Sequence, residues 1–193
     1  MRIAIEGLIG VGKSTVLAKL SDVFDVALEP VDQWTFLPLF YKDMPRYAAA
    51  FETQVLASFC GPQFAGPNIV MERSPDSAFH VFIKMLHRDT EALSGSQLQM
   101  LRAVYEHVGA HKADAFVYIS APVEVCLERL EWRNRQAEMG HVGPSYLKSL
   151  HEAYMHFLST DGRPFKVVAL EGHESPQQVA QLVCAAVMSL KSA

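Results

Sequence analysis

Short apolar runs rich in β-branched residues alternate along the chain with longer segments whose apolar residues recur at helical spacing. The apolar runs predict strands over residues 2–6, 26–29, 68–72, 115–119 and 165–170. The helical spacing predicts helices over residues 13–23, 48–60, 77–87, 97–111, 123–138, 146–158 and 176–190. Strands that alternate with helices in this way are typical of a parallel sheet covered on both faces. The pattern therefore predicts an α/β fold, with residues 1–193 in a single domain.

The first predicted strand leads directly into a glycine-rich loop, GLIGVGKST over residues 7–15. The loop fits GxxxxGK[ST], in which backbone N–H groups wrap a phosphate and the next helix points its positive end at the same anion. Lys13 can reach the β- and γ-phosphates of a nucleotide, and Ser14 can supply a hydroxyl to Mg²⁺. The loop predicts a site for ATP as phosphoryl donor, formed by Gly7, Gly10, Gly12, Lys13, Ser14 and Thr15.

This motif alone does not define the reaction. A GTPase switch would carry an Asn-Lys-x-Asp sequence that reads guanine, but neither Asn68 nor Asn134 is followed by lysine. ATPase motors are usually longer than a chain of 193 residues. A small-molecule kinase is the class that remains.

Charged residues stand at the ends of the second and third predicted strands. Glu29 follows the second strand, and Glu72 and Arg73 follow the third. Side chains at the carboxyl ends of parallel strands face the ligand crevice of an open sheet. Glu29 could accept a proton from a substrate hydroxyl, and Arg73 could bind an oxygen anion. Glu72 could hold the water shell of Mg²⁺.

Three arginines, Arg129, Arg133 and Arg135, lie near the end of the helix predicted over 123–138. Arg129 and Arg133 are four residues apart and share one face of that helix. In a P-loop protein, arginines that precede a glycine-containing segment indicate a lid that closes over the triphosphate and stabilises charge on the transferred group.

Composition and charge exclude some classes of binding partner. The net charge is −4, whereas a general nucleic-acid binder needs an excess of Lys and Arg to neutralise phosphates. No apolar run reaches the roughly 18 residues that a membrane-spanning helix requires. Cys60, Cys126 and Cys184 are too scattered for a zinc site or a disulfide framework. We expect a cytoplasmic protein that binds neither nucleic acid nor membrane.

Five further segments occur in the order found in one kinase family: EPVxxW at 29–34, YKD at 41–43, ERSPDSA at 72–78, CLERLEWRNRQAE at 126–138 and YLKSLH at 146–151. With IEGLIGVGKST at 5–15, they resemble the deoxyribonucleoside kinases, which include animal and viral thymidine, deoxycytidine and deoxyguanosine kinases. The resemblance spans most of the chain. It implies a P-loop kinase fold with a five-stranded parallel sheet and an arginine-rich lid, Mg²⁺ with ATP as the donor, and a homodimer.

The resemblance also implies roles in catalysis. Glu29 would be the general base that activates the sugar 5′-hydroxyl, and Arg73 would orient that hydroxyl and the incoming phosphoryl group, beside Lys13. Ser14 and Glu72 would bind Mg²⁺, partly through water. The donor phosphates would contact the lid residues Arg129, Arg133 and Arg135.

On the substrate side, the resemblance implies a pocket for the base and a site for the sugar. Trp34, Leu37 and Phe82 would line the base pocket, with Phe82 stacked on the base. Tyr41 and Glu138 would bind the deoxyribose 3′-hydroxyl.

The residue that reads the base depends on the alignment. Counting without a gap from Tyr41 gives Glu52, whereas an F-x-x-Q pattern that starts at Phe51 gives Gln54. An amide donates and accepts, so it pairs with N3 and O4 of thymine or with the edge of cytosine, but an ionised carboxylate only accepts. The two residues lie on different faces of a helix, so only one can face the pocket. On this chemistry we predict Gln54.

Two departures from the family pattern concern the substrate. Members that accept deoxycytidine and purines carry an Arg on this helix and an Asp after the ERS sequence. In this chain the Arg position corresponds to Phe59 or Gly61, and the Asp position corresponds to Ala78. The ERS-x-x-S-A pattern resembles thymidine-preferring and broad insect-type members. We expect thymidine as the first substrate, with deoxycytidine also accepted, in nucleotide salvage.

Three other functions fit the sequence less well than a deoxyribonucleoside kinase does. A nucleoside monophosphate kinase such as thymidylate kinase shares the fold, but its acceptor phosphate needs a further cation, and none occurs from Trp34 to Tyr41. A non-catalytic nucleotide-binding regulator would not need Glu29. A metalloprotease is excluded because His151 and His156 are five residues apart, and HExxH requires four.

Overall fold

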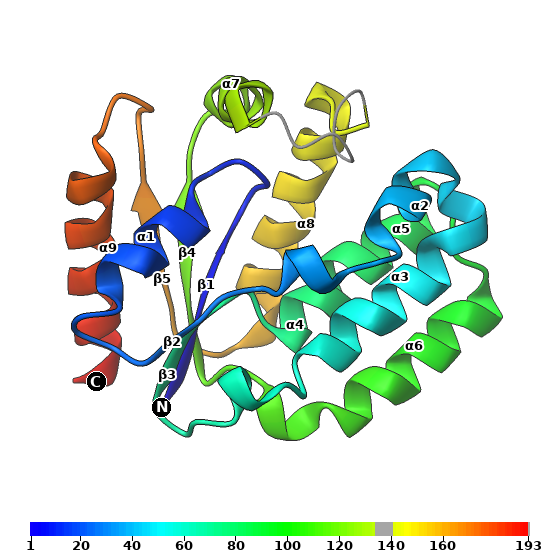
Figure 1. The fold of residues 1–193 in the computed structure, drawn as a ribbon, viewed down its shortest axis with the longest axis horizontal. Helices are drawn as coiled ribbons and strands as arrows, with labels where there is room; N and C mark the ends of the chain where they lie inside the picture. The colour runs from blue at the N-terminus through cyan, green and yellow to red at the C-terminus, as the bar shows by residue number, and fades with distance from the viewer. Residues whose placement is uncertain (134–140, 193) are drawn as a thin grey trace.

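The computed structural model describes residues 1–133 and 141–192 and contains a sheet of five parallel strands (Figure 1). The strand order is β2-β3-β1-β4-β5, and every neighbouring pair is parallel, which confirms the predicted fold class. The strands are β1 (Arg2–Gly7), β2 (Val26–Ala27), β3 (Ile69–Glu72), β4 (Ala115–Ser120) and β5 (Phe165–Ala169).

The burial of each strand explains how well its length was predicted. All residues of β1 and β3 are buried, and strands covered on both faces appear in the sequence as uninterrupted apolar runs. β2 and β5 are the two edge strands. β2 ends at Ala27 rather than at residue 29, and the next side chain, Leu28, is 41% exposed. In β5 only Val168 is buried.

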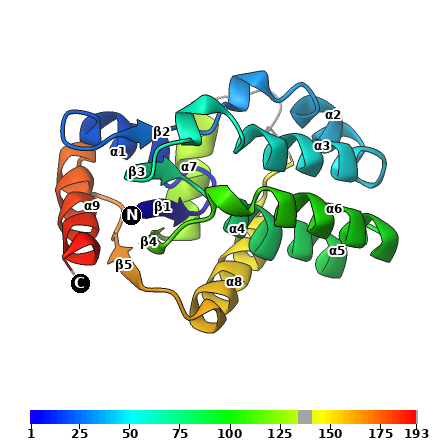
Figure 2. The same ribbon diagram turned by 90° about the horizontal axis from the view of Figure 1, so that it is seen from below.

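Helices cover both faces of this sheet (Figures 1 and 2). On one side lie α1 (Lys13–Leu20) and α9 (Pro176–Lys191), and on the other side α8 (Pro144–Asp161), α3 (Met44–Ser58) and α4 (Pro75–Ser77). Further out on that second side are α2 (Leu37–Lys42), α5 (Lys84–Asp89) and α6 (Gly95–His107). Among the residues described, no helix combines the length and apolar character needed to cross a bilayer.

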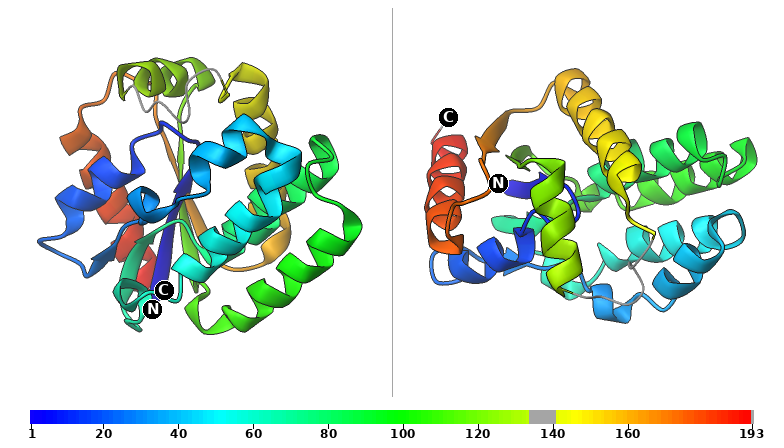
Figure 3. Two further views of the ribbon diagram at one scale, coloured as in Figure 1. Left: turned by 45° about the vertical axis from the view of Figure 1, so that its right-hand side comes forward. Right: turned by 90° about the horizontal axis from the view of Figure 1, so that it is seen from above.

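α7 (Val123–Arg133) crosses above the carboxyl ends of the strands, as Figures 1 and 3 show from three sides. Residues 134–138 of the helix predicted there lie outside the described residues. The remaining short elements are three 3₁₀ turns and one π-helical segment, at Val31–Gln33, Pro62–Phe64, Gly109–His111 and Ala78–Ile83.

Helix boundaries depart from the predicted ones where caps and prolines set the first turn. α3 begins at Met44 rather than at residue 48, because Asp43 accepts a hydrogen bond from the Arg46 amide and Pro45 fits the first turn. The helix predicted over 77–87 is a continuous run of α4, the π-helical segment and α5. Apolar periodicity reports the buried face of a helix but not its cap, so the ends were the least accurate part of the prediction.

The register of the strands brings the loops of the candidate site to one edge of the sheet. Ile5 pairs with Glu72, and Gly7 pairs with Ile119, so β1, β3 and β4 end side by side. The phosphate loop leaves β1 at this edge, Arg73 follows β3, and Glu29 lies just beyond β2. The open crevice of a parallel sheet is therefore formed by these segments.

Replacement of Gly10 by alanine is expected to lower the free energy of unfolding by at least about 1–3 kcal/mol, the cost of a non-glycine residue in a left-handed conformation. Gly10 has a φ of 86°, and an added Cβ would lie 2.5 Å from the Cys126 carbonyl oxygen of α7. Urea denaturation measures the change.

The matched control is Gly95→Ala at the start of α6, where an added Cβ meets nothing within 4 Å. This variant should be unchanged or more stable by less than about 1 kcal/mol. Equal denaturation midpoints for the two variants would contradict the role given to Gly10.

Candidate active site

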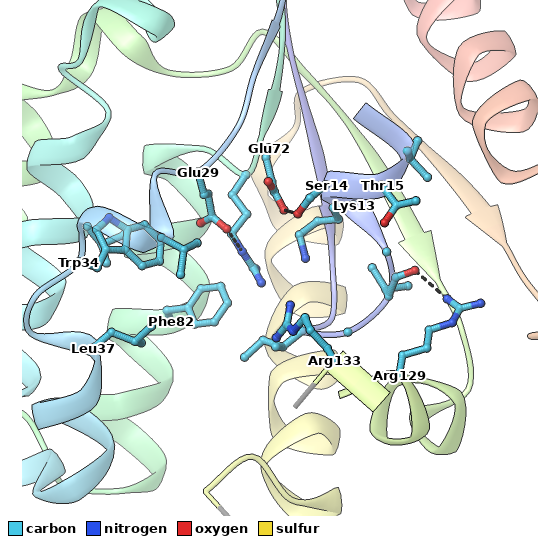
Figure 4. Close-up of a pocket in the computed structure, with 18 of the residues that line it drawn as sticks. Lys13, Ser14, Thr15, Glu29, Trp34, Leu37, Glu72, Phe82, Arg129 and Arg133 are labelled. Atoms are coloured by element: carbon cyan, nitrogen blue, oxygen red, sulfur yellow. Dashed lines mark hydrogen bonds and ion pairs between the residues drawn. The ribbon is translucent and has the colours of Figure 1, made fainter. Parts of the chain in front are cut away.

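A cavity of about 780 Å³ opens at the carboxyl edge of the sheet, between the phosphate loop and the helices α2 and α3. Figure 4 shows its two halves: Lys13, Ser14, Thr15 and Arg129 on one side, and Trp34, Leu37 and Phe82 on the other. Most residues singled out in the sequence line it: Gly10, Gly12, Lys13, Ser14, Thr15, Glu29, Trp34, Leu37, Tyr41, Glu72, Arg73, Phe82, Arg129 and Arg133. Arg135 and Glu138 lie outside the described residues.

The phosphate loop is shaped by glycines in left-handed conformations. Gly12 is the N-cap of α1, with a φ of 104°, and so directs the first amides of the helix toward the cavity. The Lys13 ammonium folds back on the loop and donates to the carbonyls of Gly7 and Leu8, at 3.2 and 3.0 Å. Burial and the nearby Arg73 lower the pKa of Lys13 to about 8. Three nearby carboxyl groups, those of Glu72, Glu29 and Glu6, act on this pKa in the opposite direction, with smaller effect. Gly7 itself lies behind the cavity at the end of β1, where an added Cβ would approach the Ile119 carbonyl.

Ser14 and Glu72 bring two side-chain oxygens together beside this loop. The Ser14 hydroxyl donates to Glu72 Oε1 at 2.7 Å. Within residues 1–133 and 141–192, no group of three His, Cys, Asp or Glu could hold a metal ion alone. Two protein oxygens next to a phosphate site fit Mg²⁺, which usually keeps several waters and takes its other ligands from phosphate.

α7 brings Arg129 and Arg133 to the phosphate half of the cavity. The Arg129 guanidinium donates to the Val11 carbonyl at 2.8 Å and so ties α7 to the phosphate loop (Figure 4). Trp132, on the same turn, also lines the cavity although its side chain is 90% exposed. Of the three arginines predicted to form a lid, Arg129 and Arg133 line the cavity, and the lid itself stays a prediction.

Glu29 and Arg73 meet where the two halves of the cavity join. Arg73 Nε donates to Glu29 Oε2 at 3.2 Å, and both side chains are less than 10% exposed. Burial raises the pKa of Glu29 to about 7, although Arg73 lowers it. Arg73 has a φ of 58°, an uncommon backbone conformation for a residue with a side chain. Its guanidinium also lies over the Phe82 ring, 4.5 Å from the centroid.

A buried network of hydrogen bonds also holds the Arg73 guanidinium in place. Arg73 Nη1 donates to the Tyr154 hydroxyl of α8 at 2.5 Å, and that hydroxyl donates to Glu6 Oε2 at 3.0 Å. The Ser74 hydroxyl donates to the other Glu6 oxygen at 2.8 Å. Glu6 and Tyr154 are fully buried. Neither was singled out from the sequence, because Glu6 reads as part of a strand and Tyr154 lies far along the chain.

The apolar half of the cavity is lined by aromatic rings from α2, α3 and the turn before α2. The Trp34 ring packs edge-on against Phe51 at 5.8 Å, and Phe51 stacks on Phe40 at 4.7 Å. Tyr41 is buried in this wall and stacks on His141. A flat aromatic ligand of nucleobase size would find ring faces here on which to pack.

The prediction that Gln54 faces this pocket is wrong. The Gln54 amide holds the turn before α2: its oxygen accepts from the Phe36 amide at 3.0 Å, and its nitrogen donates to the Gln33 carbonyl and the Thr35 hydroxyl. Glu52 lines the cavity instead and is 2% exposed. The apolar periodicity contained this signal, because Glu52 is spaced by three or four residues from the buried Ala48 and Val55.

The fold and the cavity define a P-loop kinase. Residues 3–189 match the family model described as deoxynucleoside kinase, and the chain belongs to that family of phosphotransferases.

Among its relatives, kinase protein 143R of Invertebrate iridescent virus 6 is 32% identical, over 92% of this chain and 91% of that protein. The thymidine kinase of Ictalurid herpesvirus 1 is 34% identical, over 93% of this chain and 84% of that protein. Deoxyadenosine kinase from M. mycoides superposes with a TM-score of 0.81, at 21% identity over 98% of this chain and 100% of that one.

Removal of the Tyr154 hydroxyl in Tyr154→Phe is expected to lower the free energy of unfolding by about 1–3 kcal/mol, because Arg73 and Glu6 would each lose a buried partner. Chemical denaturation, followed by circular dichroism, measures this change.

Tyr118→Phe is the matched control, since Tyr118 is also fully buried and its ring lies 5.2 Å from that of Tyr154. Within the described part of the chain its hydroxyl bonds only the half-buried His151, so we expect a loss of about 1 kcal/mol or less. A loss for Tyr118→Phe that equals or exceeds that for Tyr154→Phe would argue against this network.

Proposed function

We propose that this chain transfers the γ-phosphoryl group of ATP to the 5′-hydroxyl of a deoxyribonucleoside, with thymidine preferred and deoxycytidine also accepted. The observation that carries the proposal is the two-sided cavity, with a phosphate loop at one end and an aromatic pocket at the other. A carboxylate and a guanidinium, Glu29 and Arg73, lie at the junction. Donor and acceptor would enter from opposite sides and meet there.

Glu29 is the candidate general base. A base works best when its pKa lies near the operating pH, and the pKa of about 7 for Glu29 meets this condition. When its proton is absent, Glu29 can accept the proton of the 5′-hydroxyl as the oxygen attacks phosphorus. Arg73 would then stabilise negative charge on the transferred group, together with Lys13.

Ser14 and Glu72 are the candidate ligands of Mg²⁺, Glu72 partly through water. Their oxygens lie 2.7 Å apart beside the phosphate loop and suit a hard cation. When bound, Mg²⁺ would neutralise charge on the β- and γ-phosphates. Arg129 and Arg133 would add positive charge from α7 on the same side of the cavity.

The choice of thymidine rests on the sequence and on one relative. Ala78, where the deoxycytidine- and purine-accepting members would have Asp, lines the base half of the cavity and is 3% exposed. The herpesvirus relative at 34% identity is named a thymidine kinase. The sugar 3′-hydroxyl would be bound by Tyr41, as the family resemblance implies.

Initial rates with Mg-ATP and each of the four deoxynucleosides test the substrate proposal. We expect the highest kcat/KM for thymidine, followed by deoxycytidine, with purine deoxynucleosides lower. A faster reaction with deoxyguanosine than with thymidine would overturn the preference while leaving the kinase activity intact.

The pH dependence of kcat/KM tests the role of Glu29. Because protonated Glu29 cannot accept a proton, kcat/KM should rise on the acid side of the pH profile, through about 7, the pKa of Glu29.

Glu29→Gln removes the base with little change of shape, and should lower kcat by about 10²–10⁴-fold and abolish this acid limb. A variant that keeps more than a tenth of the wild-type kcat, with the fold intact by circular dichroism, would exclude Glu29 as the base.

A further inference from the structure

A buried carboxyl group that lines the cavity, that of Glu52, makes no hydrogen bond with any residue that the structure describes. Glu52 projects from α3 among the aromatic rings and is 2% exposed. Across residues 1–133 and 141–192, its carboxyl group makes no hydrogen bond and no ion pair. A carboxyl group that is removed from water without a hydrogen-bond partner costs free energy, so a ligand that hydrogen-bonds to Glu52 would be favoured in this cavity.

We propose that Glu52 reads the nucleoside base as a neutral carboxylic acid, through one donated and one accepted hydrogen bond. The inference rests on the proposed function and concerns the substrate end of the same site. It gives Glu52 the role for which its neighbour Gln54 was expected from the sequence. Gln54 is engaged with the turn before α2 and is not available to the cavity.

The surroundings of Glu52 favour its neutral form. Burial raises the pKa of Glu52 to about 8; Arg73, beyond β3, lowers it, and Glu29, beyond β2, raises it further. Among the described residues, the other titratable groups that line this half are hydroxyls, Tyr146 from α8 and Tyr41 from α2. Burial raises the pKa of Tyr146, so that hydroxyl also stays neutral. Burial in this half of the cavity therefore favours the protonated carboxyl group near neutral pH.

A neutral carboxylic acid has the hydrogen-bonding capacity of an amide, with one donor and one acceptor side by side. It can donate to O4 of thymine while it accepts from N3–H. It can equally donate to N3 of cytosine and accept from the N4 amino group, because the proton can sit on either oxygen. Both pyrimidines are thus read without rotation of the side chain.

Ionised Glu52 has different preferences. Its two acceptor oxygens would face the lone pairs of thymine O4 or cytosine N3, and one hydrogen bond would be replaced by repulsion. Guanine, which presents the adjacent donors N1–H and N2–H, would instead match a carboxylate. The protonation state of Glu52 would therefore select which class of base the cavity accepts.

Calorimetric titration with thymidine alone, at pH 7 and pH 9, tests this role without any contribution from catalysis. If only the neutral form binds, the wild-type Kd should rise by about 10-fold between the two values. Glu52→Gln keeps one donor and one acceptor at every pH, so its Kd should change by less than about 2-fold. Thymine N3–H also ionises in alkali, but this affects both proteins equally.

Glu106→Gln makes the same chemical change on the exposed face of α6 and serves as the matched control. It should follow the wild-type protein at both pH values. A pH dependence of Kd that is the same in wild type and Glu52→Gln would overturn the proposal.

Proton uptake provides a second measurement that needs no variant. Titrations at pH 8.5 in two buffers of different ionisation enthalpy should show the wild-type protein taking up roughly 0.8 proton per thymidine bound. Binding without proton uptake would refute the role of Glu52 and leave the kinase proposal standing. Failure of the wild-type protein to bind any deoxynucleoside would refute both.

Discussion

Arg73 is the positive charge on which the buried carboxyl groups of the active site depend. Its guanidinium is hydrogen-bonded to Glu29 on one side and to Tyr154 on the other. It lowers the pKa of Glu6, Glu29 and Glu52, each of which burial alone would raise. Breaking a buried ion pair leaves an uncompensated charge, so Glu29 needs the arginine to stay where it is. Arg73 holds its place between Glu29 and Tyr154 in an uncommon, strained backbone conformation.

The same arrangement prepares the cavity for a negatively charged donor. Arg73 and burial both lower the pKa of Lys13, so two cations lie close together at the phosphate end. An incoming triphosphate would relieve their repulsion and replace the carbonyl contacts that Lys13 makes in the loop. Electrostatic preorganisation of this kind needs a rigid scaffold, which the parallel sheet supplies through the register of β1 and β3.

Much of the fold could be predicted because buried parallel strands leave uninterrupted apolar runs. β1, β3 and β4 appear in the sequence in this way, whereas the edge strand β2 is shorter than its apolar run. Helix ends were less predictable, because caps such as Asp43 act through hydrogen bonds and not through periodicity.

The site residues that can be predicted from the sequence are those in a local motif or at the end of a strand. The phosphate loop is a local motif, and Glu29 and Arg73 stand at strand ends that a parallel sheet must bring together. Tyr154 could not be found in this way, since its contacts arise only when α8 packs on the sheet. The sequence favours Gln54 over Glu52 because an ionised carboxylate only accepts hydrogen bonds, whereas burial in the fold raises the pKa of Glu52 and so favours its neutral form.

Competition between thymidine and thymidine 5′-monophosphate distinguishes a nucleoside hydroxyl acceptor from a nucleotide phosphate acceptor. Thymidine and thymidine 5′-monophosphate are supplied together with Mg-ATP, and the products are followed by phosphorus NMR. We expect thymidine to be converted to its 5′-monophosphate with release of ADP, while the monophosphate already present is not phosphorylated further. Formation of thymidine diphosphate with thymidine left unchanged would contradict this expectation.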